Sequence, residues 1–156
     1  MPTGQGGAKG DEMLKTIAVG TDGSDTAAIA VEFAIEMAER YGARLVAISS
    51  YRPVPEDRLA KEQSSAPQEI QWSINPLEDV EATLRDVEEK AKARGVTAAS
   101  EAQQGDPADV LCDAAEAHNA DVLVVGSKGM QRRILGSIPN TVSHKAPCSV
   151  MIVKTA

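Results

Sequence analysis

The residues whose chemistry suits anion binding gather in one stretch and comprise three glycines, three basic residues and a hydroxyl: Gly126, Lys128, Gly129, Arg132, Arg133, Gly136 and Ser137. Glycine has no Cβ, so its backbone amide can approach an anion closely. The Ser-Ile-Pro sequence that follows is typical of a helix start, with Ser137 as the cap, and a helix N-terminus attracts phosphate. The pattern predicts a phosphate site; an equally open alternative is a structural strand-to-helix turn with solvated basic side chains.

A second polar group, Thr21-Asp22, directly follows the first apolar run of the chain. If that strand and the strand at 122–125 are neighbours where the winding of a sheet reverses, Asp22 and the glycine stretch face one crevice. A carboxylate there suits the hydroxyl pair of a ribose. The alternative, which the local sequence by itself favours, is a turn residue that bonds its own backbone.

Apolar strands alternate with segments of helical periodicity along the chain. We expect strands at 15–20, 44–50, 96–103, 122–125 and 149–153, and helices at 26–41, 77–94, 108–118 and 139–145. Connections of helical length between successive strands predict an α/β fold, a parallel sheet with helices on both faces. The polar character of 96–103 predicts an edge strand.

Length and composition indicate one domain at 15–156, preceded by a Gly-rich tail at 1–14 that we expect to be disordered. The net charge of −7 argues against a nucleic-acid or anionic-membrane partner. No apolar run is long enough to span a membrane, so no membrane association is expected. Cys112 and Cys148 form no C-x-x-C pair, which favours free thiols and a cytoplasmic location.

Motifs for catalysis are missing where they would be expected. The sequence around 20–24 resembles a phosphatase motif, but Gly20 occupies the position of the nucleophilic aspartate. The glycine stretch lacks the Gly-Lys-Ser/Thr of a P-loop. His118 and His144 have no carboxylate or thiol at metal-ligand spacing. We therefore expect no catalytic residue and no metal site. Slow ATP hydrolysis stays open as an alternative.

Four segments together resemble the universal stress protein family: VGTDGS at 19–24, GDPADVL at 105–111, ADVLVVGSKG at 120–129 and LGSIPNTV at 135–142. The resemblance covers nearly all of 15–154. The glycine stretch is similar to the family signature G-x2-G-x9-G-S/T, but six residues separate Gly129 from Gly136 here. Pro139 stands where many members carry Ser or Thr. The shorter loop leaves the fit of a triphosphate open.

The resemblance implies a doubly wound five-stranded parallel sheet, flavodoxin-like or Rossmann-like, with strand order 3-2-1-4-5. It implies an adenine nucleotide, ATP or AMP, at the ends of strands one and four, and a role as a stress or signalling sensor. Asp22 would meet the ribose, Ser50 the adenine, and the glycines and Ser137 the phosphates. The site it predicts comprises Thr21, Asp22, Ser50, Gly105, Gly126, Lys128, Gly129, Arg132, Arg133, Gly136, Ser137 and Ile138.

The resemblance also implies a homodimer that pairs through the last strand, Ser149 to Val153. Two alternatives stay open. One is a cyclic-AMP-binding member, because some members with a similar Gly-Ser-x-Pro ending prefer that ligand. The other is a dimeric module that binds protein partners without a nucleotide. Whether Mg²⁺ takes part is also open.

Overall fold

The computed structural model describes residues 14–51, 77–127 and 137–155. The predicted tail at 1–14 falls almost wholly outside these ranges, as do five predicted site residues, Lys128, Gly129, Arg132, Arg133 and Gly136. The described elements, in chain order, are β1 (Thr16–Gly20), α2 (Asp25–Tyr41), β2 (Arg44–Tyr51), α5 (Leu77–Ala93), β3 (Ala98–Gln104), α6 (Pro107–Ala117), β4 (Val122–Gly126), α7 (Ser137–Lys145) and β5 (Ser149–Val153).

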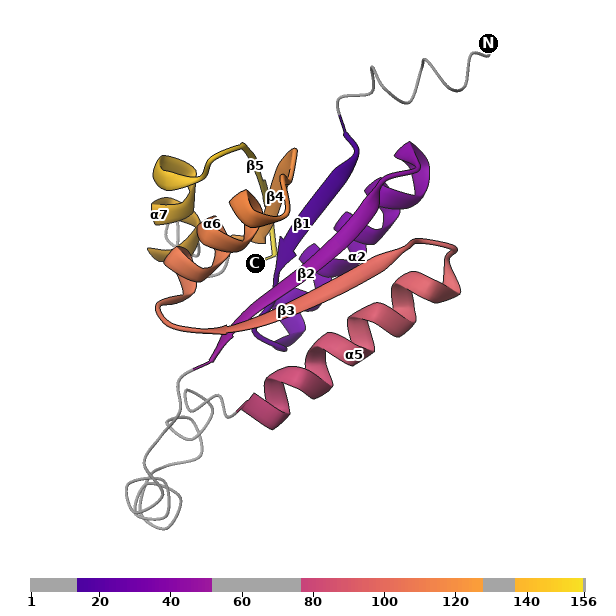
Figure 1. Ribbon diagram of the computed structural model, residues 1–156, viewed down its shortest axis with the longest axis horizontal. Helices are drawn as coiled ribbons and strands as arrows, with labels where there is room; N and C mark the ends of the chain where they lie inside the picture. Colours follow the sequence, from indigo (N-terminus) through magenta and orange to yellow (C-terminus); the bar gives the residue numbers. More distant parts are fainter. Residues whose placement is uncertain (1–13, 52–76, 128–136, 156) are drawn as a thin grey trace.

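The strands form one parallel sheet in the order β3-β2-β1-β4-β5 (Figure 1). The chain winds outwards from β1 through β2 to β3, then returns to the other side of β1 with β4. The predicted doubly wound α/β fold is therefore confirmed, and so is the edge position of β3. The winding reverses between β1 and β4, which is where ligands bind in such sheets.

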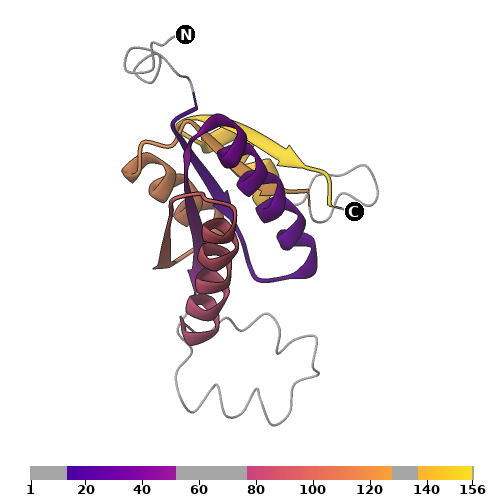
Figure 2. The ribbon, with the colours of Figure 1, turned by 90° about the vertical axis from the view of Figure 1, so that its right-hand side faces the viewer.

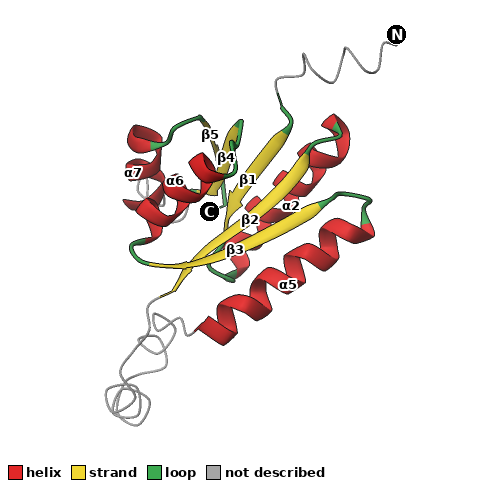
Figure 3. Ribbon diagram, viewed as in Figure 1, coloured by secondary structure: helices red, strands yellow, loops and turns green. Residues whose placement is uncertain are grey.

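Helices cover both faces of the sheet (Figures 1 and 3): α2 and α5 lie on one face, and α6 and α7 on the other. Alternate residues of each central strand point to opposite faces and join two separate apolar cores. In β1, Ile17 and Val19 pack towards α2 and α5, while Ala18 packs towards α6. Burial on both faces explains why the central strands are nearly uniformly apolar.

The ends of the helices follow local sequence signals. Ser24 caps α2 by accepting a hydrogen bond from the amide of Ala27, and Gly42 ends the same helix in the left-handed conformation. Asp106 caps α6, with Pro107 as its first residue. α7 begins at Ser137, two residues before the start predicted for the helix at 139–145. Ser137 is therefore the first helical residue of α7, and the prediction that it caps this helix was wrong.

None of the helices in the described parts of the chain is both long and apolar enough to cross a membrane.

Candidate ligand site at the sheet switch point

A cavity of about 440 Å³ lies at the carboxyl ends of β1, β2 and β4, and its volume falls in the range usual for small-molecule sites. Its wall is mainly apolar and is formed by Ala27, Ile48, Pro107, Leu111, Val125, Ile138 and Pro139. Hydroxyl groups, two glycines and one carboxylate complete it: Gly20, Thr21, Asp22, Ser24, Thr26, Ser49, Ser50, Gly126, Ser137 and Thr155. An apolar slot edged by hydroxyls suits a flat, partly polar ligand.

The turn between β1 and α2 is held by its own side chains. Thr21 Oγ1 accepts a hydrogen bond from the amide of Gly23 (3.1 Å), and Asp22 Oδ1 accepts one from the amide of Ser24 (2.9 Å). Ser24 Oγ then accepts from the amide of Ala27 (3.1 Å). Asp22 therefore holds the turn and also lines the cavity, and its contact with a ribose stays a prediction.

Two hydrogen bonds from β2 fix the position of this turn. Ser49, buried to 3% exposure, donates a hydrogen bond from Oγ to the carbonyl of Thr21 at 2.7 Å. The amide of Thr21 donates to the carbonyl of Ile48 at 3.0 Å. These two bonds extend the contact between β1 and β2 past the last strand residue. The Asp22 backbone is thus held rigidly at the rim of the cavity.

Two glycines shape the wall because neighbouring side chains occupy the space of a Cβ. A Cβ on Gly20 would lie 2.7 Å from Leu111 Cδ2, so Leu111 packs directly on the end of β1. A Cβ on Gly126 would lie 3.1 Å from Thr155 Cγ2. The sequence assigned Gly126 to close approach of an anion; the structure gives its missing Cβ a packing role against Thr155. Gly126 still lines the cavity.

The helix N-termini around the carboxyl edge differ in charge. The first turns of α2, α5 and α6 hold acidic residues, namely Asp25, Glu78, Asp79 and Asp109. α7 has none, and among the described helices it is the one without an acid in its first turn. A negative side chain at a helix N-terminus neutralises the partial positive charge that would attract an anion. An anion in this cavity is therefore best placed at the α7 end, beside Gly126 and Ser137.

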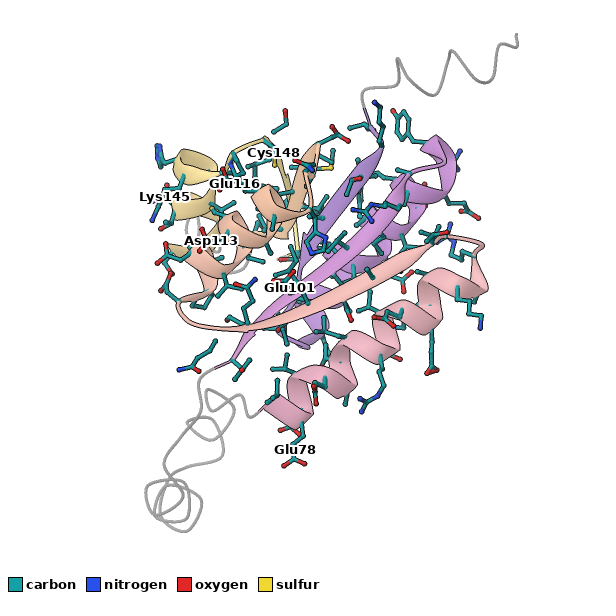
Figure 4. The ribbon with its side chains drawn as sticks, viewed as in Figure 1. Glu78, Glu101, Asp113, Glu116, Lys145 and Cys148 are labelled. Carbon is teal, nitrogen blue, oxygen red and sulfur yellow. The ribbon has the colours of Figure 1, made fainter. Side chains whose placement is uncertain are left out.

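Lys145 lies in the last turn of α7 (Figure 4). It forms an exposed ion pair with Asp109 of α6 at 2.8 Å. The hydrogen bond and negative charge of Asp109 raise the pKa of the Lys145 ammonium group. The pair joins the two helices on this face of the sheet and offsets one of the negative charges near the start of α6.

Six of the predicted site residues meet in one cavity: Thr21, Asp22, Ser50, Gly126, Ser137 and Ile138. Gly105 is not part of its wall. Its φ of +145° and its amide hydrogen bond to the Tyr51 carbonyl (3.2 Å) give it a role in the turn after β3 instead. A Cβ there would also lie 3.3 Å from Val110 Cγ2. The remaining five predicted residues lie outside the described ranges.

Sequence reasoning missed several residues of the wall, above all Leu111, Pro107 and Thr155. Leu111 reads as an ordinary core position of an amphipathic helix, and Thr155 as part of a tail after the last strand. No local motif marks either residue. The useful signal is topological, since both lie where an element meets the carboxyl edge of the sheet.

The winding order and the cavity at its reversal define a doubly wound α/β protein with a cavity at the switch point. The chain belongs to the universal stress protein family, whose sequence model (Usp) matches residues 13–154. The family resemblance of the four segments is thereby confirmed.

Relatives cover nearly the whole chain. Universal stress protein Rv1636 of Mycobacterium tuberculosis is 35% identical over 145 residues, which are 90% of this chain and 97% of that protein. Universal stress protein MJ0531 of Methanocaldococcus jannaschii is 32% identical over 151 residues, which are 93% of this chain and 85% of that protein. A universal stress protein crystallised in complex with cAMP is 32% identical, with a TM-score of 0.71, covering 93% of this chain and all of that one.

Proposed function

We propose that this universal stress protein binds an adenine nucleotide in the switch-point cavity and acts as a stress or signalling sensor. The observation that carries the proposal is the cavity itself, with an apolar slot, a carboxylate at one rim and an acid-free helix start at the other. An adenine ring suits the slot, a ribose suits Asp22, and a phosphate suits the α7 end. The cAMP complex of a 32% identical relative supports an adenine nucleotide as the ligand.

Mononucleotides, AMP or cyclic AMP, fit the described charges better than ATP does. Each further phosphate adds negative charge to a cavity that the first turns of α2 and α6 help to line, through Thr26, Ala27 and Pro107, and both of these turns carry an acidic residue. Exposed charges interact over roughly 8 Å at physiological salt, so Asp25 and Asp109 disfavour added negative charge there. We therefore place cyclic AMP and AMP ahead of ATP, without a requirement for Mg²⁺.

Isothermal titration with cyclic AMP, AMP and ATP, each with and without Mg²⁺, tests the proposal. We expect saturable binding of at least one mononucleotide, tighter than that of ATP and insensitive to Mg²⁺. Absence of heat with all three nucleotides would leave the family's nucleotide-independent role, a module for protein partners, as the function.

Asp22→Asn locates the binding site. Asparagine keeps an oxygen that can accept from the amide of Ser24, so the turn is retained while the charge is lost. Hydrogen bonds to charged groups contribute about 1.5–3 kcal/mol, which corresponds to a loss of affinity of tenfold or more. Asp25→Asn is the matched control, because Asp25 is an exposed acid three positions along that does not line the cavity. If both variants change the nucleotide affinity equally, Asp22 acts only through its charge and makes no specific contact with the ligand.

We also propose that two copies pair through β5. Within the described chain β5 pairs with β4 alone, so its outer edge offers unpaired backbone groups. Val150, Met151 and Ile152 are only partly buried on this strand. A second copy in antiparallel pairing would continue the sheet and cover them.

An apolar flank of α2 lies beside this edge. Lys90 of α5 pairs with Glu32, and Arg94, the residue after α5, pairs with Glu39, which places that flank of α2 towards α5. Phe33, about half exposed, lies on the flank of α2 away from these pairs, and the equally exposed Ile29 lies on the outer surface between the two flanks. Figure 2 shows α2 between α5 and β5. Antiparallel pairing of β5 about a twofold axis normal to the sheet puts both α2 helices on one face. The two flanks would then face each other across the junction.

Light scattering after size exclusion tests the dimer. We expect the mass of two chains, and the mass of one chain for Met151→Lys on β5. Ala99→Lys, an exposed position of the opposite edge strand β3, is the control and should leave the dimer intact. A monomeric parent protein would refute the pairing.

The protein is further proposed to bind its nucleotide without catalysis and to reside in the cytoplasm. Incubation with ATP followed by measurement of released phosphate tests the first point. Phosphate release faster than slow hydrolysis would contradict it. Cell fractionation tests the second.

A further inference from the structure

One hydroxyl in the wall of the cavity has no role in the fold. Thr155 lies two residues beyond β5 and lines the cavity, and its Oγ1 is shielded from water. Among the described residues Oγ1 has no hydrogen-bond partner, and it is the one buried side-chain polar atom there of which this is true. Buried polar groups are nearly always paired, so an exception calls for an explanation.

The backbone around this side chain is firmly held. The amide of Ser127 donates to the carbonyl of Val153 at 2.9 Å, and the amide of Thr155 donates to Ser127 Oγ at 3.0 Å. Ser127 itself is fully buried. The position of Thr155 is therefore set by the joined ends of β4 and β5, and fraying of the chain end does not account for the unpaired hydroxyl.

The hydroxyl lies at the acid-free end of the cavity. A Cβ on Gly126 would be 3.5 Å from Thr155 Oγ1 and 3.1 Å from Cγ2, so the side chain packs against the Gly126 backbone. Gly126, Thr155 and Ser137 of the α7 first turn all line the same cavity. A rotation about the Cα–Cβ bond of Thr155 exchanges Oγ1 and Cγ2 between staggered positions and can turn the hydroxyl towards a ligand.

We propose that the Thr155 hydroxyl donates a hydrogen bond to a phosphate oxygen of the bound nucleotide and so favours phosphorylated ligands over nucleosides. The proposal rests on the nucleotide function given above. It explains the unpaired hydroxyl as a binding group whose acceptor arrives with the ligand. It also explains why position 126 is glycine, since any larger residue would displace Thr155.

Thr155→Val and Thr155→Ser test the proposal. Valine has nearly the shape of threonine but no hydroxyl, and serine keeps the hydroxyl. Removing a hydroxyl that has no partner is neutral or stabilising, whereas removing a paired one destabilises. We therefore expect Thr155→Val to leave the melting temperature of the ligand-free protein unchanged or higher, and to weaken AMP binding about fivefold. Thr155→Ser should bind AMP close to the parent, and adenosine should bind parent and valine variant equally.

Titration of AMP and adenosine into the parent and both variants separates the possible results. AMP affinity of Thr155→Val equal to that of the parent would overturn the proposal while leaving nucleotide binding intact. An equal loss for adenosine would overturn the assignment to phosphate. A clear drop in the melting temperature of ligand-free Thr155→Val would show a structural partner for the hydroxyl and overturn it too. If the parent protein binds cyclic AMP and not AMP, cyclic AMP takes the place of AMP in these titrations. Binding of no nucleotide to the parent protein would instead contradict the proposed function, and this proposal with it.

Discussion

Replacing Gly20 with alanine tests how the apolar slot is formed. The new Cβ would lie 2.7 Å from Cδ2 and 2.9 Å from Cδ1 of Leu111, which is too close for the present packing. Both atoms are at the free end of a flexible side chain that lines the cavity, so Leu111 can yield into the slot. The φ of Gly20 is outside the left-handed region, and alanine adds no backbone strain there.

The expected effects on stability and binding differ in size. Overpacking of a core costs about 1–3 kcal/mol, and a yielding side chain puts this case near the lower limit. Replacing glycine also lowers the conformational entropy of the unfolded chain, which stabilises the folded protein by about 0.4–1 kcal/mol. The net cost is therefore about 0–1 kcal/mol, or a melting temperature lower by at most about 4 °C. A pocket altered by one methylene discriminates by about 1–3 kcal/mol, so nucleotide affinity should fall by about tenfold or more.

Urea denaturation and isothermal titration measure the two effects. Leu111→Ala alone should cost about 2–3 kcal/mol, the lower part of the range for buried leucine, because its site opens onto the cavity. In the double variant the clash is gone, so the two changes should be less destabilising together than their sum by about 1 kcal/mol. Gly95→Ala is the control: its φ of +75° strains an alanine, but no atom lies within 4 Å of the added Cβ. It should lower stability without weakening nucleotide binding.

Two results would refute this reasoning. If Gly20→Ala lowers the free energy of unfolding by about 3 kcal/mol but keeps the nucleotide affinity of the parent, then the backbone moves to relieve the clash and Leu111 does not. If the two substitutions are additive, Gly20 and Leu111 are not in the contact that the structure gives them.

Three further predictions concern the supports of the site. Ser49→Ala should lower the free energy of unfolding by about 1–2 kcal/mol in urea titration, because the buried Thr21 carbonyl loses its donor; an unchanged midpoint would contradict this. Burial raises the pKa of both Cys112 and Cys148, so alkylation should be slower than for a free thiol near pH 8. Since the protonated thiols are favoured on folding, their contribution is complete below about pH 8.5 and is lost as pH rises through the folded pKa values. Stability that rises with pH in this range would show the sign to be wrong. Asp121→Ala should cost about 1.5–3 kcal/mol, because the carboxylate accepts hydrogen bonds of 2.8 and 2.9 Å from two amides at the start of β1, and a loss under 0.5 kcal/mol would contradict that role.

The fold was predictable because each element carries its own signal. Buried parallel strands read as apolar runs, and α2 and α5 show one apolar face each with glycine after the end. These signals depend on neighbours in sequence. The start of α7 was misplaced because Ser137 and Pro139 are both good residues for a first turn, so the local sequence fits more than one register.

The site was predictable only where it follows from strand ends. Asp22, Ser50 and Gly126 end or follow strands that pair in the sheet, and parallel pairing brings such ends together. Leu111 and Thr155 contact the site through packing between segments far apart in the chain, which no local pattern encodes. Gly105 shows the opposite case. It was predicted from a motif, but its glycine is explained by the geometry of the turn after β3, and it is not part of the cavity wall.

In the complex proposed above, the charges around the cavity favour one orientation of the nucleotide. With the carboxylate of Asp22 at the β1 end, a phosphate placed there would meet like charge, and the amides of Gly23 and Ser24 are already bonded to side chains. At the opposite end α7 starts without an acid, and the hydroxyls of Ser137 and Thr155 line the wall. A nucleotide bound with its phosphate towards α7 leaves its sugar hydroxyls towards Asp22, where a carboxylate can accept them. The reverse orientation would place an anion beside a carboxylate. In the proposed complex, charge therefore favours one direction of binding before any contact specific to adenine is made.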